Sequence, residues 1–76
     1  MSWEDRIEVN PEILVGKPVI KGTRISVELV VGCLADGWTE QEILENYPHI
    51  THEDILACLD YARDMLQEFR QYQLPA

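Results

Sequence analysis

The sequence predicts a small, mainly α protein in which a trihelical helix-turn-helix bundle follows a short N-terminal β element. Apolar residues recur at helical spacing from position 27 onward, and a Thr-x-x-Glu capping box begins a short helix within that segment. Short stretches in which polar and apolar residues alternate, interrupted by Gly and Pro, occur in the first 26 positions. Because 76 residues build one small core, we expect a single domain over 1–76. Its parts are the β element over about 6–26, the helical bundle over about 27–70 and a flexible tail over 71–76.

A short strand and a small hairpin make up the expected β element. Residues 6–9 alternate polar and apolar side chains before an Asn-Pro turn, which predicts a short strand. Residues 19–20 and Ile25 flank a turn that contains Gly22, which predicts a small hairpin of its own.

Short strands leave backbone groups unpaired along an edge, and pairing between two copies would remove that edge. We therefore expect a homodimer. Its candidate partner contacts are Ile7, Val9, Val19 and Ile20 in the β element and Tyr72 and Leu74 in the tail. A monomer whose strands fold back on its own helices is the alternative.

Caps and stops delimit the first two helices. Ser26 is the natural N-cap of a helix that ends at Gly37. Thr39 and Glu42 form the capping box of a second, short helix that Pro48 ends. The apolar face of the first helix holds Val27, Val30, Val31 and Leu34.

The third helix has the most regular pattern in the sequence. Thr51 caps it, and Glu53 and Asp54 suit the positive end of its dipole. An apolar stripe then recurs at spacings of four and three residues and holds Ile55, Leu59, Ala62, Leu66 and Phe69. We expect this stripe to be buried, so that Leu59→Ala costs about 2–4 kcal/mol. The outward side chains would then be those of residues 52, 53, 56, 57 and 60.

One stretch of the sequence is more specific than any generic helix-turn-helix pattern. It is Gly16-Lys17-Pro18-Val19-Ile20-Lys21-Gly22-Thr23-Arg24-Ile25, followed by Gly37-Trp38-Thr39, Glu42-Ile43, Tyr47-Pro48, Ile50-Thr51, Asp54-Ile55 and Tyr61-Ala62. On these residues the sequence resembles the domain-of-unknown-function family 433, from about Ile7 to Ala62. The resemblance implies a homeodomain-like trihelical bundle and an antitoxin role beside a toxin similar to PIN-type ribonucleases.

Charge restricts the partners of the chain. The formal net charge is -8, and the first 25 residues hold equal numbers of acids and bases, so the excess falls on 26–76. The outward side of the third helix offers no Arg, Lys, Asn or Gln, while Glu53 and Asp60 would repel phosphate. The candidate nucleic-acid contacts are Lys17, Lys21 and Arg24, so we expect DNA binding to be weak or to require a partner. Alternatively, these bases are scattered and solvated, with Arg24 paired to an acid of the chain.

Two functional hypotheses follow. The first is an antitoxin-like regulator that neutralises a PIN-like ribonuclease by contact, with autoregulatory DNA binding as a further role. The acidic segment 26–76 suits the basic face of a ribonuclease. The second is a protein-interaction module that binds no DNA and has no toxin partner.

We expect no enzyme activity, no cofactor and no metal site. A turn separates His49 from His52, so the two do not share a helical face that could bind a metal ion. Cys33 and Cys58 lie among apolar residues, as core side chains do. The chain shows neither a signal peptide nor an apolar run near the roughly 20 residues that cross a bilayer, so we expect a cytoplasmic protein and no membrane partner.

Overall fold

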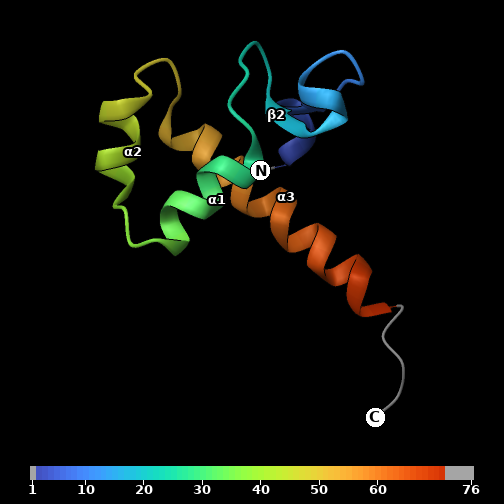
Figure 1. Ribbon diagram of the computed structural model, residues 1–76. Coiled ribbons are helices and arrows are strands. Elements are labelled where there is room, and N and C mark those ends of the chain that lie inside the picture. Colours follow the sequence, from blue (N-terminus) through green and yellow to red (C-terminus); the bar gives the residue numbers. More distant parts are fainter. Residues whose placement is uncertain (1, 72–76) are drawn as a thin grey trace.

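The computed structural model describes residues 2–71. In chain order the elements are the 3-10 turn η1 (Trp3–Asp5), strand β1 (Ile7–Val9), the 3-10 turn η2 (Leu14–Gly16), strand β2 (Pro18–Ile20) and helices α1 (Val27–Ala35), α2 (Glu40–Asn46) and α3 (His52–Gln71). In Figure 1 the second half of α3 extends past the rest of the described chain. The predicted mainly α fold with a short N-terminal β element is confirmed.

The β element is one antiparallel hairpin, in which β1 pairs with β2. The Cα partners are Ile7 with Ile20, Glu8 with Val19 and Val9 with Pro18. The second hairpin expected after β2 is reduced to a single bridge between Val19 and Ser26. The turn between them is tight, because Thr23 donates both its N–H and its hydroxyl to the carbonyl oxygen of Ile20. Ser26 already caps α1, so Ile25 has no room to extend a strand.

The predicted caps of α1 and α2 are confirmed. The Ser26 hydroxyl accepts the N–H of Leu29 at 3.0 Å. Thr39 accepts the N–H of Glu42 at 3.1 Å, and the Glu42 carboxylate accepts the N–H of Thr39 at 2.9 Å. The hydrogen bonds from Thr39 hold the pKa of Glu42 below its usual range. Gly37 follows α1 with a φ of 95°, a left-handed conformation that suits glycine, and so α1 ends where predicted.

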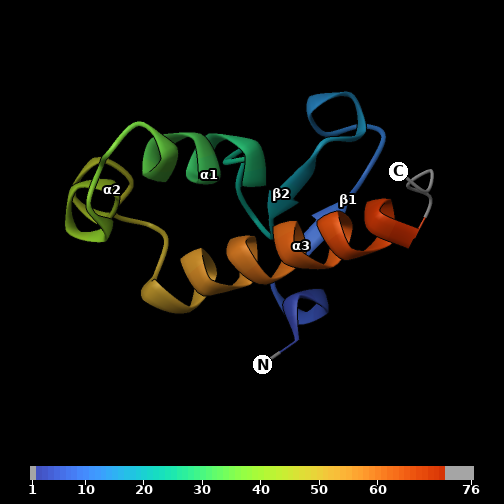
Figure 2. The same cartoon turned by 90° about the horizontal axis from the view of Figure 1, so that it is seen from below.

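The core lies where the hairpin and the three helices meet. Its most deeply buried large side chains are Val19, Val30, Ile43, Ile55 and Cys58. In Figure 2, α1 lies on one side of α3 and η1 lies on the other. The first half of α3 is therefore the element around which the described chain packs.

The predicted burial of the α3 stripe is confirmed for Ile55 and is wrong for Leu59, Leu66 and Phe69. Ile55 is 1% exposed, whereas Leu59 is 42%, Leu66 66% and Phe69 68% exposed. Ala57, expected to face outward, is fully buried instead. Length explains the exposure of Leu66 and Phe69: α3 has 20 residues and spans about 30 Å, but α1 has nine and α2 has seven, so they cover only part of it. Leu59 lies in the covered half, but it is on the side of the helix turned away from its fully buried neighbour Cys58.

The N-terminal turn η1 is fastened to the middle of α3. The backbone N–H of Trp3 donates to Asp60 at 3.1 Å, and its indole N–H donates to Asp64 at 2.8 Å. The indole also meets the ring of Tyr61 edge-on, with the ring centroids 4.8 Å apart. Asp60 was expected to face outward, but its carboxylate is occupied by the chain's own N-terminal segment.

Candidate protein-interaction surface

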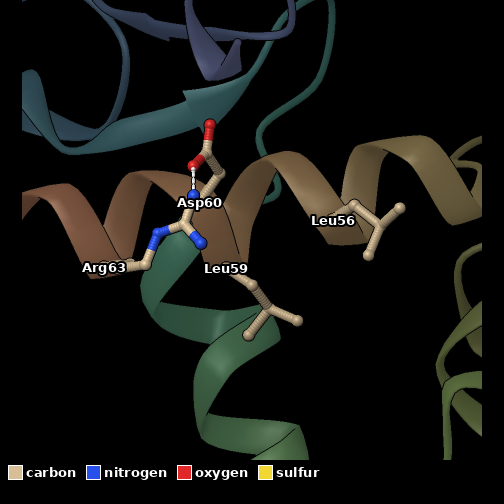
Figure 3. Close-up of a pocket in the computed structure, with 4 residues that line it drawn as sticks. All are labelled: Leu56, Leu59, Asp60 and Arg63. Atoms are coloured by element: carbon tan, nitrogen blue, oxygen red, sulfur yellow. Dashed lines mark hydrogen bonds and ion pairs between the residues drawn. The ribbon is translucent and has the colours of Figure 1, made fainter. Parts of the chain in front are cut away.

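A depression of about 390 Å³ on α3 is lined by Leu56, Leu59, Asp60 and Arg63. Figure 3 shows the two leucines pointing away from the strand, with the ion pair between Asp60 and Arg63 on the other side. Leu56 is 40% exposed and Leu59 42% exposed, so the depression presents two apolar side chains together. A depression lined by two leucines and a neutralised charge pair is a suitable place for an apolar side chain of another protein. We call these four residues the Leu56 depression.

The first turn of α3 is the part that a helix-turn-helix protein lays in the DNA major groove. Here Nδ1 of His52 lies 2.7 Å from Oε2 of Glu40, which belongs to α2. Glu53 is exposed next to it, and residues 52–60 contain no Arg, Lys, Asn or Gln. This end of α3 therefore presents acids, a histidine held by a carboxylate and an exposed Leu56, none of which reads a base edge bidentately.

The three basic candidates for nucleic-acid contact differ in their surroundings. Nζ of Lys17 donates to the Glu28 carboxylate on α1 at 2.9 Å, and this bond holds the pKa of Glu28 below its usual range. Nζ of Lys21 donates to the carbonyl oxygen of Glu4 at 2.9 Å. Arg24 is exposed in the turn after β2. Of these three bases, Lys17 forms an ion pair within the described residues, and Arg24 does not. Two of the three bases are thus already engaged within the chain.

The expected partner contacts of the β element divide into two groups. Ile7, Val19 and Ile20 are buried in the chain's own core, because the hairpin packs its apolar face on the helices. Their side chains therefore offer little surface to a second copy, and pairing of the strand edge between copies stays a prediction. Val9 is more than half exposed and remains accessible. The other two expected contacts, Tyr72 and Leu74, lie outside the described residues.

The cysteines are core residues, as predicted. Cys33 and Cys58 are free thiols and both are buried. Burial, with a smaller contribution from the Asp54 carboxylate, raises the pKa of Cys58 to about 12. Within residues 2–71, no three His, Cys, Asp or Glu side chains are grouped to hold a metal ion. The helices described over the same range include none with the length and apolarity to span a membrane.

The match to a family model extends over most of this architecture. The model described as "Protein of unknown function (DUF433)" matches residues 7–62. The chain belongs to the DUF433 family. The crystal structure of a DUF433 member from Anabaena variabilis ATCC 29413 superposes with a TM-score of 0.79 and is 29% identical in sequence. The superposition covers 90% of this chain and 67% of that one, so the two share the fold.

A curated relative of this DUF433 chain is an uncharacterized protein, y4eO, from Sinorhizobium fredii (strain NBRC 101917 / NGR234). It is 38% identical over 53 residues, which cover 70% of this chain. The same segment covers 24% of y4eO, so the chain spans about a quarter of the length of that relative. The resemblance on the Gly16 to Ile25 stretch is thereby confirmed at the level of the family.

Sequence reasoning missed that half of the α3 stripe is a surface. The signal was present in the spacing: steps of four and three average 3.5 residues, the period of a seam between two helices. A helix buried against its own domain shows a broader apolar face of period 3.6. No comparable signal existed for the contact of Trp3 with Asp60, because 57 positions separate the two residues.

Proposed function

We propose that this DUF433 protein is an antitoxin-like regulator that neutralises a PIN-like ribonuclease by direct contact. The observation that carries the proposal is the exposed Leu56 depression on α3 of a chain with a net charge of -8. In this role the chain performs no catalytic step of its own. It acts by covering the ribonuclease.

Charge and apolar area contribute differently to such a contact. A ribonuclease presents basic side chains to RNA phosphates, and the acidic excess on residues 26–76 attracts such a face. This attraction speeds association and selects the partner more than it adds affinity. Affinity comes from apolar anchoring, for which Leu56 and Leu59 are exposed near the centre of the acidic segment.

Autoregulatory DNA binding belongs to the complex in this proposal. A basic ribonuclease offsets the negative charge of the chain, so that phosphate is no longer repelled at long range. Lys17, Lys21 and Arg24 would then contact operator phosphates, with Lys17 and Lys21 leaving Glu28 and the Glu4 carbonyl. DNA contact by the isolated chain stays weak.

The test is inhibition of the PIN-like ribonuclease encoded beside the gene of this protein. The purified chain is expected to abolish RNA cleavage at equimolar ratio. Leu56→Arg places a positive charge in the depression and is expected to lose at least tenfold in inhibition. Gln41→Arg adds the same charge on the exposed surface of α2 and is expected to inhibit like the unsubstituted chain. A genome neighbourhood without such a ribonuclease, or equal inhibition by both variants, contradicts the proposal.

The second candidate function is a protein-interaction module that binds no DNA and has another partner. The observation that favours it is the contact of His52 with Glu40 in the turn where a DNA reader carries base-contacting side chains. Purification from the native host separates the two functions. A ribonuclease in stoichiometric amount supports the first, and a different stoichiometric partner supports the second.

A further inference from the structure

We propose that α3 pairs in an antiparallel orientation with α3 of a second copy of the chain. The seam is formed by Leu59, Ala62, Leu66 and Phe69, and each projecting helix end covers a groove on the other copy. This inference goes beyond the proposed function. The two share Leu59, so a ribonuclease in the Leu56 depression and a second copy on the seam compete for that side chain.

The first argument is the pattern of the seam. Its residues follow one another at three, four and three positions, which are the a and d positions of a heptad. Leu66 and Phe69 are each about two-thirds exposed, and Leu59 is nearly half exposed. A helix end that carries such a seam gains little stability by itself in water, because isolated helical turns are marginal. A second helix is the complementary surface for a heptad seam.

The second argument is an apolar groove next to the seam. It has a volume of about 380 Å³ and lies between the start of α1, strand β2 and the second half of α3. Its apolar lining is Pro18, Val27, Val31, Tyr61, Met65 and Leu66. In Figure 1, α3 continues beyond α1 and β2. Each copy therefore offers both a groove and a projecting apolar helix, which is the condition for a self-complementary two-fold interface.

The register of the pair follows from the seam itself. In an antiparallel pair, Leu59 lies opposite the partner's Phe69, and Ala62 lies opposite the partner's Leu66. All four seam positions are then used on both copies, and the small alanine faces a large leucine. The second half of α3 lies over the body of the partner, where the groove is.

Charge permits this approach despite a net charge of -8 on each copy. Asp60 and Asp64 bind Trp3 on another side of α3, and Glu28, the acid in the groove, is paired with Lys17 at 2.9 Å. The surfaces that meet are thus apolar, while the acids face away or are neutralised. Long-range repulsion between the copies remains and is screened by salt. Dimerisation should therefore strengthen as salt rises, the opposite of a contact with a basic partner.

The exposed side chains of the seam set the area that the pair buries. Phe69 is 68% exposed, Leu66 66%, Leu59 42% and Met65 37%. Two copies therefore bury on the order of 1,000 Å², which is the size of a weak, reversible interface.

Sedimentation equilibrium of the full chain at tens of micromolar tests the interface. We expect twice the mass of 8.8 kDa, with a dissociation constant that falls as salt is raised. Leu66→Glu is expected to sediment as a monomer and to keep its helical circular dichroism, because the side chain is exposed within the single chain. Gln67→Glu adds the same charge one position away and is expected to remain a dimer. A monomeric unsubstituted chain, or a dimeric Leu66→Glu variant, would overturn the proposal.

Cysteine cross-linking tests the orientation. In the antiparallel register, Ala62→Cys does not cross-link to itself, because two copies of position 62 lie roughly 10 Å or more apart and a disulfide needs about 4.4–6.8 Å between Cα atoms. An oxidised mixture of Ala62→Cys and Leu66→Cys chains is expected to give only the mixed disulfide. Self-cross-linking of Ala62→Cys, or no mixed product, overturns the register.

Discussion

Nη1 of Arg6 donates to Oδ1 of Asp54 at 3.0 Å, although 48 positions separate the two residues. The other oxygen of that carboxylate accepts the N–H of Thr51 at 3.0 Å, and the N–H of Asp54 donates to the Thr51 hydroxyl at 3.2 Å. The nearly buried Asp54 carboxylate thus caps α3 and links that helix to Arg6, the residue before β1.

Asp54→Ala is expected to destabilise the domain by about 2–3 kcal/mol, since it removes the cap and the partner of Arg6 together. Arg6→Ala, which leaves the cap intact, should cost about 1 kcal/mol, because the guanidinium is partly solvated. The neighbouring exposed acid gives the control: Glu53→Ala should cost less than about 0.5 kcal/mol. Urea unfolding monitored by circular dichroism measures all three. Equal losses of unfolding free energy for Asp54→Ala and Glu53→Ala would show that the α3 cap and the Arg6–Asp54 ion pair contribute nothing to stability.

Leu59→Ala is expected to cost less than about 1 kcal/mol, and Ile55→Ala about 2–4 kcal/mol. Leu59 is exposed within the single chain and Ile55 is fully buried, although they lie on the same stripe four positions apart. The comparison is made in the Leu66→Glu background, so that self-association does not contribute. A loss for Leu59→Ala as large as that for Ile55→Ala would restore the original expectation of a buried stripe.

Val15→Gly is expected to stabilise the chain by about 0.5–1 kcal/mol. Val15 has φ 57° and ψ 37°, a left-handed conformation that is unfavourable for a β-branched side chain, and it is 95% exposed, so no packing is lost. Val9→Gly is the control, because Val9 is exposed in a regular strand and its replacement should destabilise. Thermal unfolding measures both variants. A lower melting temperature for Val15→Gly would mean that the strain is absent.

Cys58 is expected to resist alkylation by iodoacetamide at pH 8.5 in the native state and to react rapidly in urea. Burial raises its pKa to about 12, so the native thiol stays protonated and shielded. In the unfolded chain the thiol ionises near its ordinary value of 9.0, so the unfolded state binds fewer protons above that pH. Stability should therefore fall as pH rises from about 9 to 12, and Cys58→Ala should make that fall shallower. Rapid native labelling of Cys58 would contradict this account.

Local signals in the sequence predicted the helices and their ends well. Ser26, Gly37 and the Thr39 box act through hydrogen bonds and backbone angles within four residues of themselves, so the sequence contains the whole interaction. The pairing of β1 with β2 and the tie of Arg6 to Asp54 depend on which distant segments meet, and no local pattern specifies that.

The candidate surface was predicted less well than the fold. The stripe on α3 was correct as a periodic pattern, and the short lengths of α1 and α2 were predicted as well. The periodicity did not show where along α3, and against which side of it, these two helices pack. Burial of Ile7, Val19 and Ile20 likewise depends on the hairpin packing on the helices, which periodicity over three residues does not predict.

In the proposed function, the outer surface of α3 faces a protein and not a DNA groove. A fluorescence anisotropy titration of the chain against its own upstream DNA, at about 150 mM salt where the screening length is about 8 Å, tests it most directly. We predict no binding by the isolated chain at micromolar concentration, and that any residual binding disappears when Lys17, Lys21 and Arg24 are replaced by Ala. Submicromolar binding that survives this triple replacement but is lost in His52→Ala or Leu56→Ala would show that α3 reads DNA, and would contradict the account.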